Sequence, residues 1–73
     1  MRKSKNADIP SERIMTVLGA PYVNFRSTPN NDPGNIIEVL MEGNQVAATT
    51  EVGEYTGCRY GSKYGYVMTK YLK

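Results

Sequence analysis

Glycine, proline and asparagine recur throughout this 73-residue chain and divide it into apolar runs too short for ordinary helices. No window carries the sustained 3.6-residue apolar period that an amphipathic helix requires. The runs are RIMTVL (13–18), VNFRS (23–27), IIEVLM (36–41), QVAATTE (45–51), YTGCRY (55–60) and KYGYVM (63–68). Five or six short strands, with turn signals every eight to twelve residues, predict an all-β fold.

The segments between these runs carry the residues that turns need. TPNNDPGN at 28–35 concentrates turn formers and predicts a loop. Gly-Asn at 43–44 and Gly-Ser at 61–62 each predict a tight turn. TKYLK at 69–73 is too short for an α-helix and predicts a single 3-10 turn. Because a barrel removes exposed strand edges, we expect a small barrel of five to six short antiparallel strands.

The length allows one small domain, which buries only about 60% of its unfolded surface. Its single cysteine, Cys58, excludes an intramolecular disulfide. Residues 1–8 are polar and predict a disordered basic linker or tail, followed by a barrel domain at 9–73. We find neither a secretory signal in MRKSKNADIP nor an apolar stretch of membrane-spanning length. The chain is therefore expected to be either cytosolic or a piece of a longer polypeptide that is exported.

The formal net charge of +2 comes from the first five residues, which hold Arg2, Lys3 and Lys5. Residues 6–73 contain six basic and seven acidic side chains. A nucleic-acid-binding protein needs clustered cations that displace counterions from phosphate. This distribution argues against a nucleic-acid partner, and no feature indicates a membrane partner.

The sequence lacks the residues that most catalytic and metal sites require. Without histidine it has no Ser-His or Cys-His pair and no ordinary zinc site. Glu51 and Glu54 are the nearest carboxylate pair, but they flank a predicted turn where both would be solvated, which does not suit acid–base catalysis. Cys58 lies mid-strand and is interpreted as a buried small side chain. We therefore expect a protein that is not an enzyme and binds no metal or cofactor.

Tyrosine is the one residue type that suggests binding, with six copies against one Phe and no Trp. Strand parity directs Tyr64 and Tyr66 to the face opposite Val67, the natural core residue of that strand. Tyr60 lies on the same face as Cys58 and is interpreted as structural. The outward rings either cover a small barrel or line a shallow groove for an extended peptide or a sugar, and we favour the groove.

Several motifs in order resemble those of bacterial SH3 (SH3b) domains. VNFRSTP at 23–29 is similar to the L-N-V-R-S-G-P signature of that family. IIEVL, MEGNQV, YTGCRY and GSKYGYV follow in the family's order, and the chain closes on KYL. The resemblance covers residues 14–72. It departs from the family at Tyr55, where Trp is usual, and at Thr28 and Glu54, where Gly is common.

The resemblance implies an SH3-like barrel in which Asn24 and Arg26 brace the long loop that follows them. Such modules commonly attach to cell-wall hydrolases, phage endolysins and surface proteins. They bind peptidoglycan peptides between that loop and aromatic residues of later strands. Carried over to this sequence, the ligand-binding residues are Asn24, Arg26, Thr28, Asn30, Asn31, Asp32, Tyr55, Tyr64, Tyr66 and Tyr71.

We therefore expect a noncatalytic module that binds a stem or cross-bridge peptide of peptidoglycan and targets a linked hydrolase to the wall. Attachment to an enzyme, or self-association, would raise the effective affinity. The module would be extracellular or wall-associated, or cytoplasmic until lysis if a phage encodes it. The alternative is an SH3-like interaction or structural domain with a protein partner. A groove for proline-rich peptides usually includes a Trp, which this chain lacks.

Overall fold

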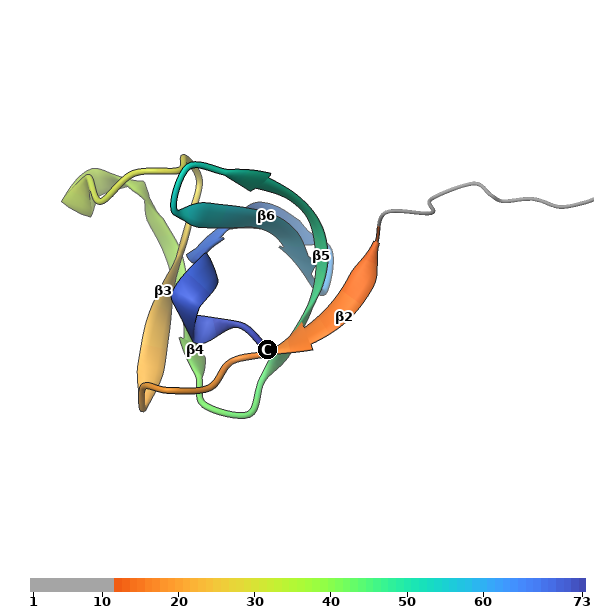
Figure 1. Cartoon of the computed structure of the whole chain (residues 1–73). Coiled ribbons are helices and arrows are strands. Elements are labelled where there is room, and N and C mark those ends of the chain that lie inside the picture. The colour runs from red at the N-terminus through yellow and green to blue at the C-terminus, as the bar shows by residue number, and fades with distance from the viewer. Residues whose placement is uncertain (1–11) are drawn as a thin grey trace, which may run out of the picture.

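A computed structural model of the chain describes residues 12–73, so the linker predicted at 1–8 lies outside the described residues. Six strands and two 3-10 turns follow in the order β2 (Arg13–Thr16), β3 (Tyr22–Arg26), η1 (Pro33–Asn35), β4 (Ile36–Met41), β5 (Gln45–Val52), β6 (Tyr55–Tyr60), β7 (Lys63–Met68) and η2 (Thr69–Tyr71). All pairings are antiparallel, in the sheet order β2-β5-β6-β7-β3-β4. The predicted small SH3-like barrel and its terminal 3-10 turn are confirmed (Figure 1). The turn η1 was not predicted.

Alternation along the strands builds the core. In β3, Val23 and Phe25 are buried while Tyr22, Asn24 and Arg26 are not, and in β7 Val67 is fully buried as predicted. The main cluster takes residues from the segment after β2, from β3 to β7 and from the C-terminal segment: Val17, Val23, Phe25, Leu40, Val46, Ala48, Cys58, Val67 and Leu72. Tyr60 packs against this cluster, with its ring centroid 6.3 Å from that of Phe25, in agreement with its predicted structural role.

Gly65 allows β7 to cross close to β3. A Cβ atom at this position would lie 2.5 Å from the Arg26 carbonyl oxygen and 3.0 Å from the Phe25 ring. Close packing therefore requires glycine at position 65.

A two-residue turn at 61–62 joins β6 to β7. Gly61 has a φ of 62°, which is the left-handed conformation that two-residue hairpin loops favour.

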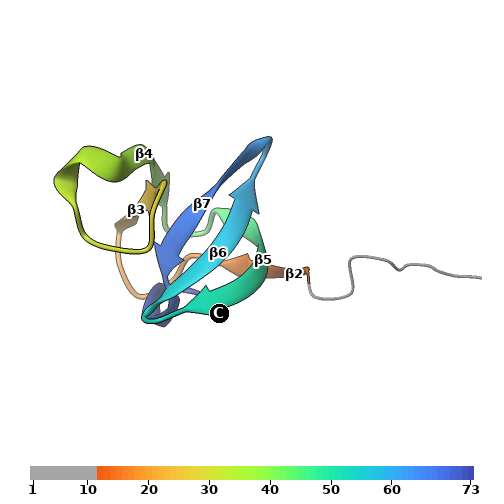
Figure 2. The ribbon, with the colours of Figure 1, turned by 90° about the horizontal axis from the view of Figure 1, so that it is seen from above.

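The C-terminal segment closes one end of the barrel. Val17 and Leu72 form an isolated bridge, and the backbone groups of Thr16 and Lys73 exchange hydrogen bonds of 2.8 and 3.0 Å. The Leu18 N–H donates to the Tyr71 carbonyl oxygen, which holds η2 in place. The loop between β3 and β4 projects from the barrel on the side away from β2, as Figure 1 and Figure 2 both show.

Candidate ligand-binding surface

The loop at 27–35 is held in one shape by hydrogen bonds from its two ends. Arg26 Nη1 donates to the Asp32 carbonyl oxygen at 2.9 Å and to Asn35 Oδ1 at 2.8 Å. The Ser27 N–H donates to the Asn35 carbonyl oxygen at 2.8 Å, which closes the base of the loop. The bracing role that the family resemblance implied for Arg26 is therefore present in the structure. No side-chain hydrogen bond joins Asn24 to the loop within residues 12–73.

Asn35 is the centre of this network and was not predicted. It is buried, and its Nδ2 lies 2.7–3.2 Å from four oxygens, the carbonyl and side-chain oxygens of Thr28 and Asn30. Its Oδ1 meanwhile accepts from Arg26. One amide thus supplies both a donor and an acceptor to the loop. Its position directly before an apolar strand is the only sequence signal that distinguishes it from the other loop asparagines.

Three of the loop residues predicted to contact a ligand use side-chain atoms inside the loop instead. Asn30 Oδ1 accepts from the Asp32 N–H at 3.0 Å, and Asp32 Oδ1 accepts from the Gly34 N–H at 2.9 Å. Thr28 Oγ1 accepts from Asn35 at 2.7 Å. Within the described chain the exposed Asn31 side chain makes no hydrogen bond to protein. The polar groups of Thr28, Asn30 and Asp32 therefore hold the shape of the loop, and Asn31 is the predicted loop residue whose side chain makes no hydrogen bond among residues 12–73.

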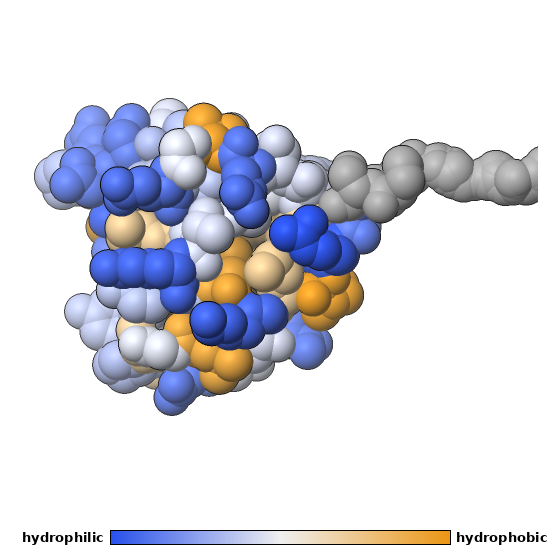
Figure 3. Space-filling view, viewed as in Figure 1, coloured by the Kyte–Doolittle hydropathy of each residue, from blue (hydrophilic) through white to orange (hydrophobic). Residues whose placement is uncertain are grey.

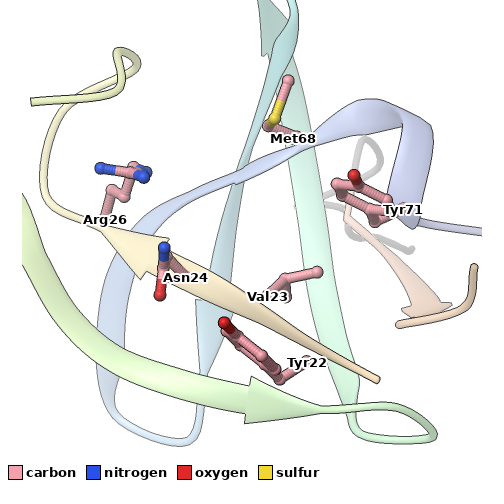
Figure 4. A pocket seen from close by; sticks show the side chains of 6 residues that line it. All are labelled: Tyr22, Val23, Asn24, Arg26, Met68 and Tyr71. Atoms are coloured by element: carbon pink, nitrogen blue, oxygen red, sulfur yellow. The ribbon is translucent and has the colours of Figure 1, made fainter. Parts of the chain in front are cut away.

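A shallow depression of about 220 Å³ lies between β3, the end of β7 and η2 (Figure 4). Its lining residues are Tyr22, Val23, Asn24, Arg26, Met68 and Tyr71. Figure 4 shows Arg26 and Asn24 on one side of the depression and Tyr71 on the other. Tyr22 is 55% exposed, and Lys70 Nζ lies 5.1 Å from the centroid of the Tyr71 ring. Rings, an amide and a guanidinium thus converge on one surface that could hold a short polar chain.

A second depression of about 290 Å³ lies over the middle of β5, β6 and β7. Gly57 lines it, and a Cβ atom there would lie 3.2 Å from the Thr50 side chain and 3.4 Å from the Tyr66 ring. Tyr64, which is 72% exposed, also lines it. Cys58 belongs to the lining but is buried, and burial raises the pKa of its thiol to about 11. The thiol therefore stays protonated at neutral pH and is a poor nucleophile.

The structure separates the tyrosines that were predicted to line a single groove. Tyr71 lies in the first depression with Asn24 and Arg26, whereas Tyr64 and Tyr66 lie in the second. Arg26, which lines the first depression, pairs in register with Tyr66, which lines the second. Tyr55 lines neither depression, and its side chain is only 8% exposed. Its register neighbours in β5 and β7 lie on either side of it, so its ring offers little surface to a ligand.

Three lining residues of the first depression, Tyr22, Val23 and Met68, were not among the predicted site residues. Strand alternation could have identified Tyr22, since it lies on the same face of the strand as Asn24 and Arg26. Met68 shares a face with Tyr66, but nothing in the sequence shows that β3 and η2 meet beside it.

The surface of the molecule mixes apolar and hydrophilic side chains. On the face seen in Figure 3, apolar side chains lie in separate spots among hydrophilic ones. Surface ion pairs join Glu12 to Arg59 and Glu38 to Lys63. Residues 12–73 contain no group of three His, Cys, Asp or Glu side chains that could hold a metal ion, and none of their helices is long and apolar enough to cross a membrane.

Comparison with protein-family models, curated proteins and solved structures finds no match to this chain. The geometry and the motifs therefore carry the functional argument.

Proposed function

We propose that this chain is a noncatalytic binding module for a short peptide of the bacterial cell wall. The observation that carries the proposal is the depression lined by Tyr22, Asn24, Arg26 and Tyr71, which lies beside a rigid loop. Rings provide contact area at little entropic cost, and amide and guanidinium groups bind peptide carbonyl or carboxylate oxygens. The SH3-like barrel and the motifs similar to SH3b domains support peptidoglycan as the source of that peptide.

In this proposal the ligand is a stem or cross-bridge peptide bound in an extended conformation. Asn24 and Arg26 Nη2 bind its polar groups, since Arg26 Nη1 is already bonded to the loop, and the two tyrosine rings contact the side chains and backbone of the peptide. Affinity for one such peptide is modest, because the depression is shallow and open. A linked or associated hydrolase would gain from the module by being held near its substrate. The module would then act at the wall, outside the cell or after lysis.

A pulldown with purified peptidoglycan tests this function. The wild-type chain is expected to sediment with walls of at least one of several Gram-positive species. Tyr22→Ala is expected to reduce the bound fraction by about tenfold, because the removed ring is a large part of the contact area. Its thermal melt should stay near that of the wild type, since Tyr22 is half exposed and outside the core.

Tyr64→Ala is the matched control, because Tyr64 is an exposed ring of the second depression. Reduced binding in Tyr64→Ala with unchanged binding in Tyr22→Ala would move the site to the second depression. If the wild-type chain binds no wall from any species, the proposal of a cell-wall module is overturned and a protein partner becomes the better hypothesis.

A further inference from the structure

The guanidinium of Arg26, which lines the first depression, is held in place through only one of its nitrogens. Nη1 donates to the Asp32 carbonyl oxygen at 2.9 Å and to Asn35 Oδ1 at 2.8 Å, which uses both of its hydrogens. Among residues 12–73, no protein group accepts a hydrogen bond from Nε or Nη2. These two nitrogens carry parallel N–H groups whose spacing matches the two oxygens of a carboxylate.

The positive charge of Arg26 is not neutralised by a carboxylate within the described part of the chain. The two acceptors of Nη1 are a backbone carbonyl and a side-chain amide, which carry no net charge. Asp32 Oδ1 accepts from the Gly34 N–H, and among the described residues the Asp32 carboxylate forms no ion pair. By contrast, Arg59 and Lys63 are each paired with a glutamate. Arg26 is therefore fixed in position while its charge stays available to a ligand.

The rest of the first depression adds positive charge and no acid. Its other lining residues are all uncharged, namely Tyr22, Val23, Asn24, Met68 and Tyr71. Lys70 Nζ lies 5.1 Å from the centroid of the Tyr71 ring, which places a second cation beside the depression. Glu54 lines a separate hollow with Met68 and Lys70 and does not line this one. A ligand in the first depression therefore meets an excess of positive charge.

We infer that the first depression binds its peptide by a carboxylate, whose two oxygens accept from Nε and Nη2 of Arg26. This step rests on the proposed function, since it names the group of the peptide that the same site recognises. A bidentate, charge-assisted contact is about twice as strong as a hydrogen bond between neutral groups. The Asn24 amide lines the same surface and binds a neighbouring backbone group of the peptide. Lys70 adds attraction at longer range without a fixed bond.

Titration of the isotope-labelled full chain with soluble peptides, followed by NMR, tests the carboxylate. The probe is acetyl-alanyl-glutamyl-alanine, which carries one internal and one terminal carboxylate. Conversion of the recognised carboxylate to an amide is expected to raise the dissociation constant by about tenfold, because a charge-assisted contact is lost. A C-terminal amide and glutamine in place of the glutamate, each alone and both together, identify which carboxylate is bound. These changes leave the protein intact, which matters because Arg26 also holds the loop.

Lys70→Gln tests the charge from the protein side without disturbing the loop. It is expected to weaken binding of the acid peptide by about two- to threefold and to leave binding of the doubly amidated peptide unchanged, since only a charge is removed. Lys63→Gln is the matched control, because Lys63 is also exposed but lines neither depression. Equal weakening by the two variants would overturn local recognition of the carboxylate, since only the net charge would then matter.

Equal affinity for the acid and doubly amidated peptides would overturn the carboxylate site, and so would the absence of any shift at millimolar peptide. Neither result depends on the wall pulldown, so the proposed function can stand without this site. A chain that prefers the acid peptide but sediments with no wall would instead overturn the proposed function and support the carboxylate site. Failure of one proposal is therefore distinguishable from failure of the other.

Discussion

At the scale of single residues, Asn35 does most to shape the surface beside the candidate site. It is 8% exposed at the end of a loop whose other residues are mostly solvated. Its amide donates toward the oxygens of Thr28 and Asn30 and accepts from Arg26. A carboxylate could satisfy Arg26 but would repel those oxygens, and an apolar side chain would satisfy neither. Only an amide of this length serves both sides.

Asn35→Ala is expected to lower the free energy of unfolding by about 1–3 kcal/mol, because it leaves buried polar groups without partners. Urea denaturation followed by circular dichroism measures the change. Asn31→Ala, in the same loop but exposed, should stay within about 0.5 kcal/mol of the wild type. Similar losses in the two variants would show that Asn35 has no special role in the loop.

At the scale of elements, alternation and turn residues predicted the strands with little error. Most predicted strands agree with β3 to β7 within one residue, and the terminal 3-10 turn lies where it was expected. The run at 13–18 proved shorter as a strand, since it leaves the sheet after Thr16 and Val17 pairs with Leu72 instead. These signals are local, so a single sequence contains them.

The candidate site was harder to predict because it depends on which elements meet. Alternation along a strand predicts the face to which each tyrosine points, but not which residues pack over that face. The burial of Tyr55 was therefore missed. The division of Tyr71 from Tyr64 and Tyr66 follows from the place where η2 folds against β3, which is a long-range contact. Asn35 was missed for a related reason, since its role depends on hydrogen bonds that form only when the loop closes.

The close crossing of β3 and β7 makes Gly65 the most sensitive glycine. Gly65→Ala is expected to cost about 2–3 kcal/mol, because the new methyl group overlaps the Arg26 carbonyl and the Phe25 ring. Thermal unfolding measures this loss. Gly34→Ala serves as control, since the nearest atom to its Cβ would be Asp32 Oδ1 at 3.4 Å. A Gly65→Ala melt equal to that of the control would mean that the two strands can separate without cost.

At the scale of the whole molecule, a small core must hold six strands together. A domain of this size is marginally stable, so a change of about 1–2 kcal/mol is a large fraction of its free energy of unfolding. The C-terminal residues add to the core through Leu72 and cover one sheet edge through Lys73.

Cys58 links this global stability to pH. Burial raises the pKa of its thiol from 9.0 to about 11, because the low-dielectric core disfavours the thiolate. Above pH 9.0 the unfolded chain loses this proton while the folded chain keeps it. Folding then loses up to about 1.4 kcal/mol per pH unit until the folded pKa is reached. This contribution is fully present below the unfolded pKa and falls as the pH rises.

Comparison with Cys58→Ala isolates the effect, since the two proteins differ only at this side chain. The stability difference between wild type and Cys58→Ala is expected to stay constant from neutral pH to 9.0 and then to move against the wild type up to about pH 11. Urea denaturation at each pH provides the measurement. A difference that stays flat across this range would mean that the thiol titrates alike in both states and that the centre of the barrel admits water.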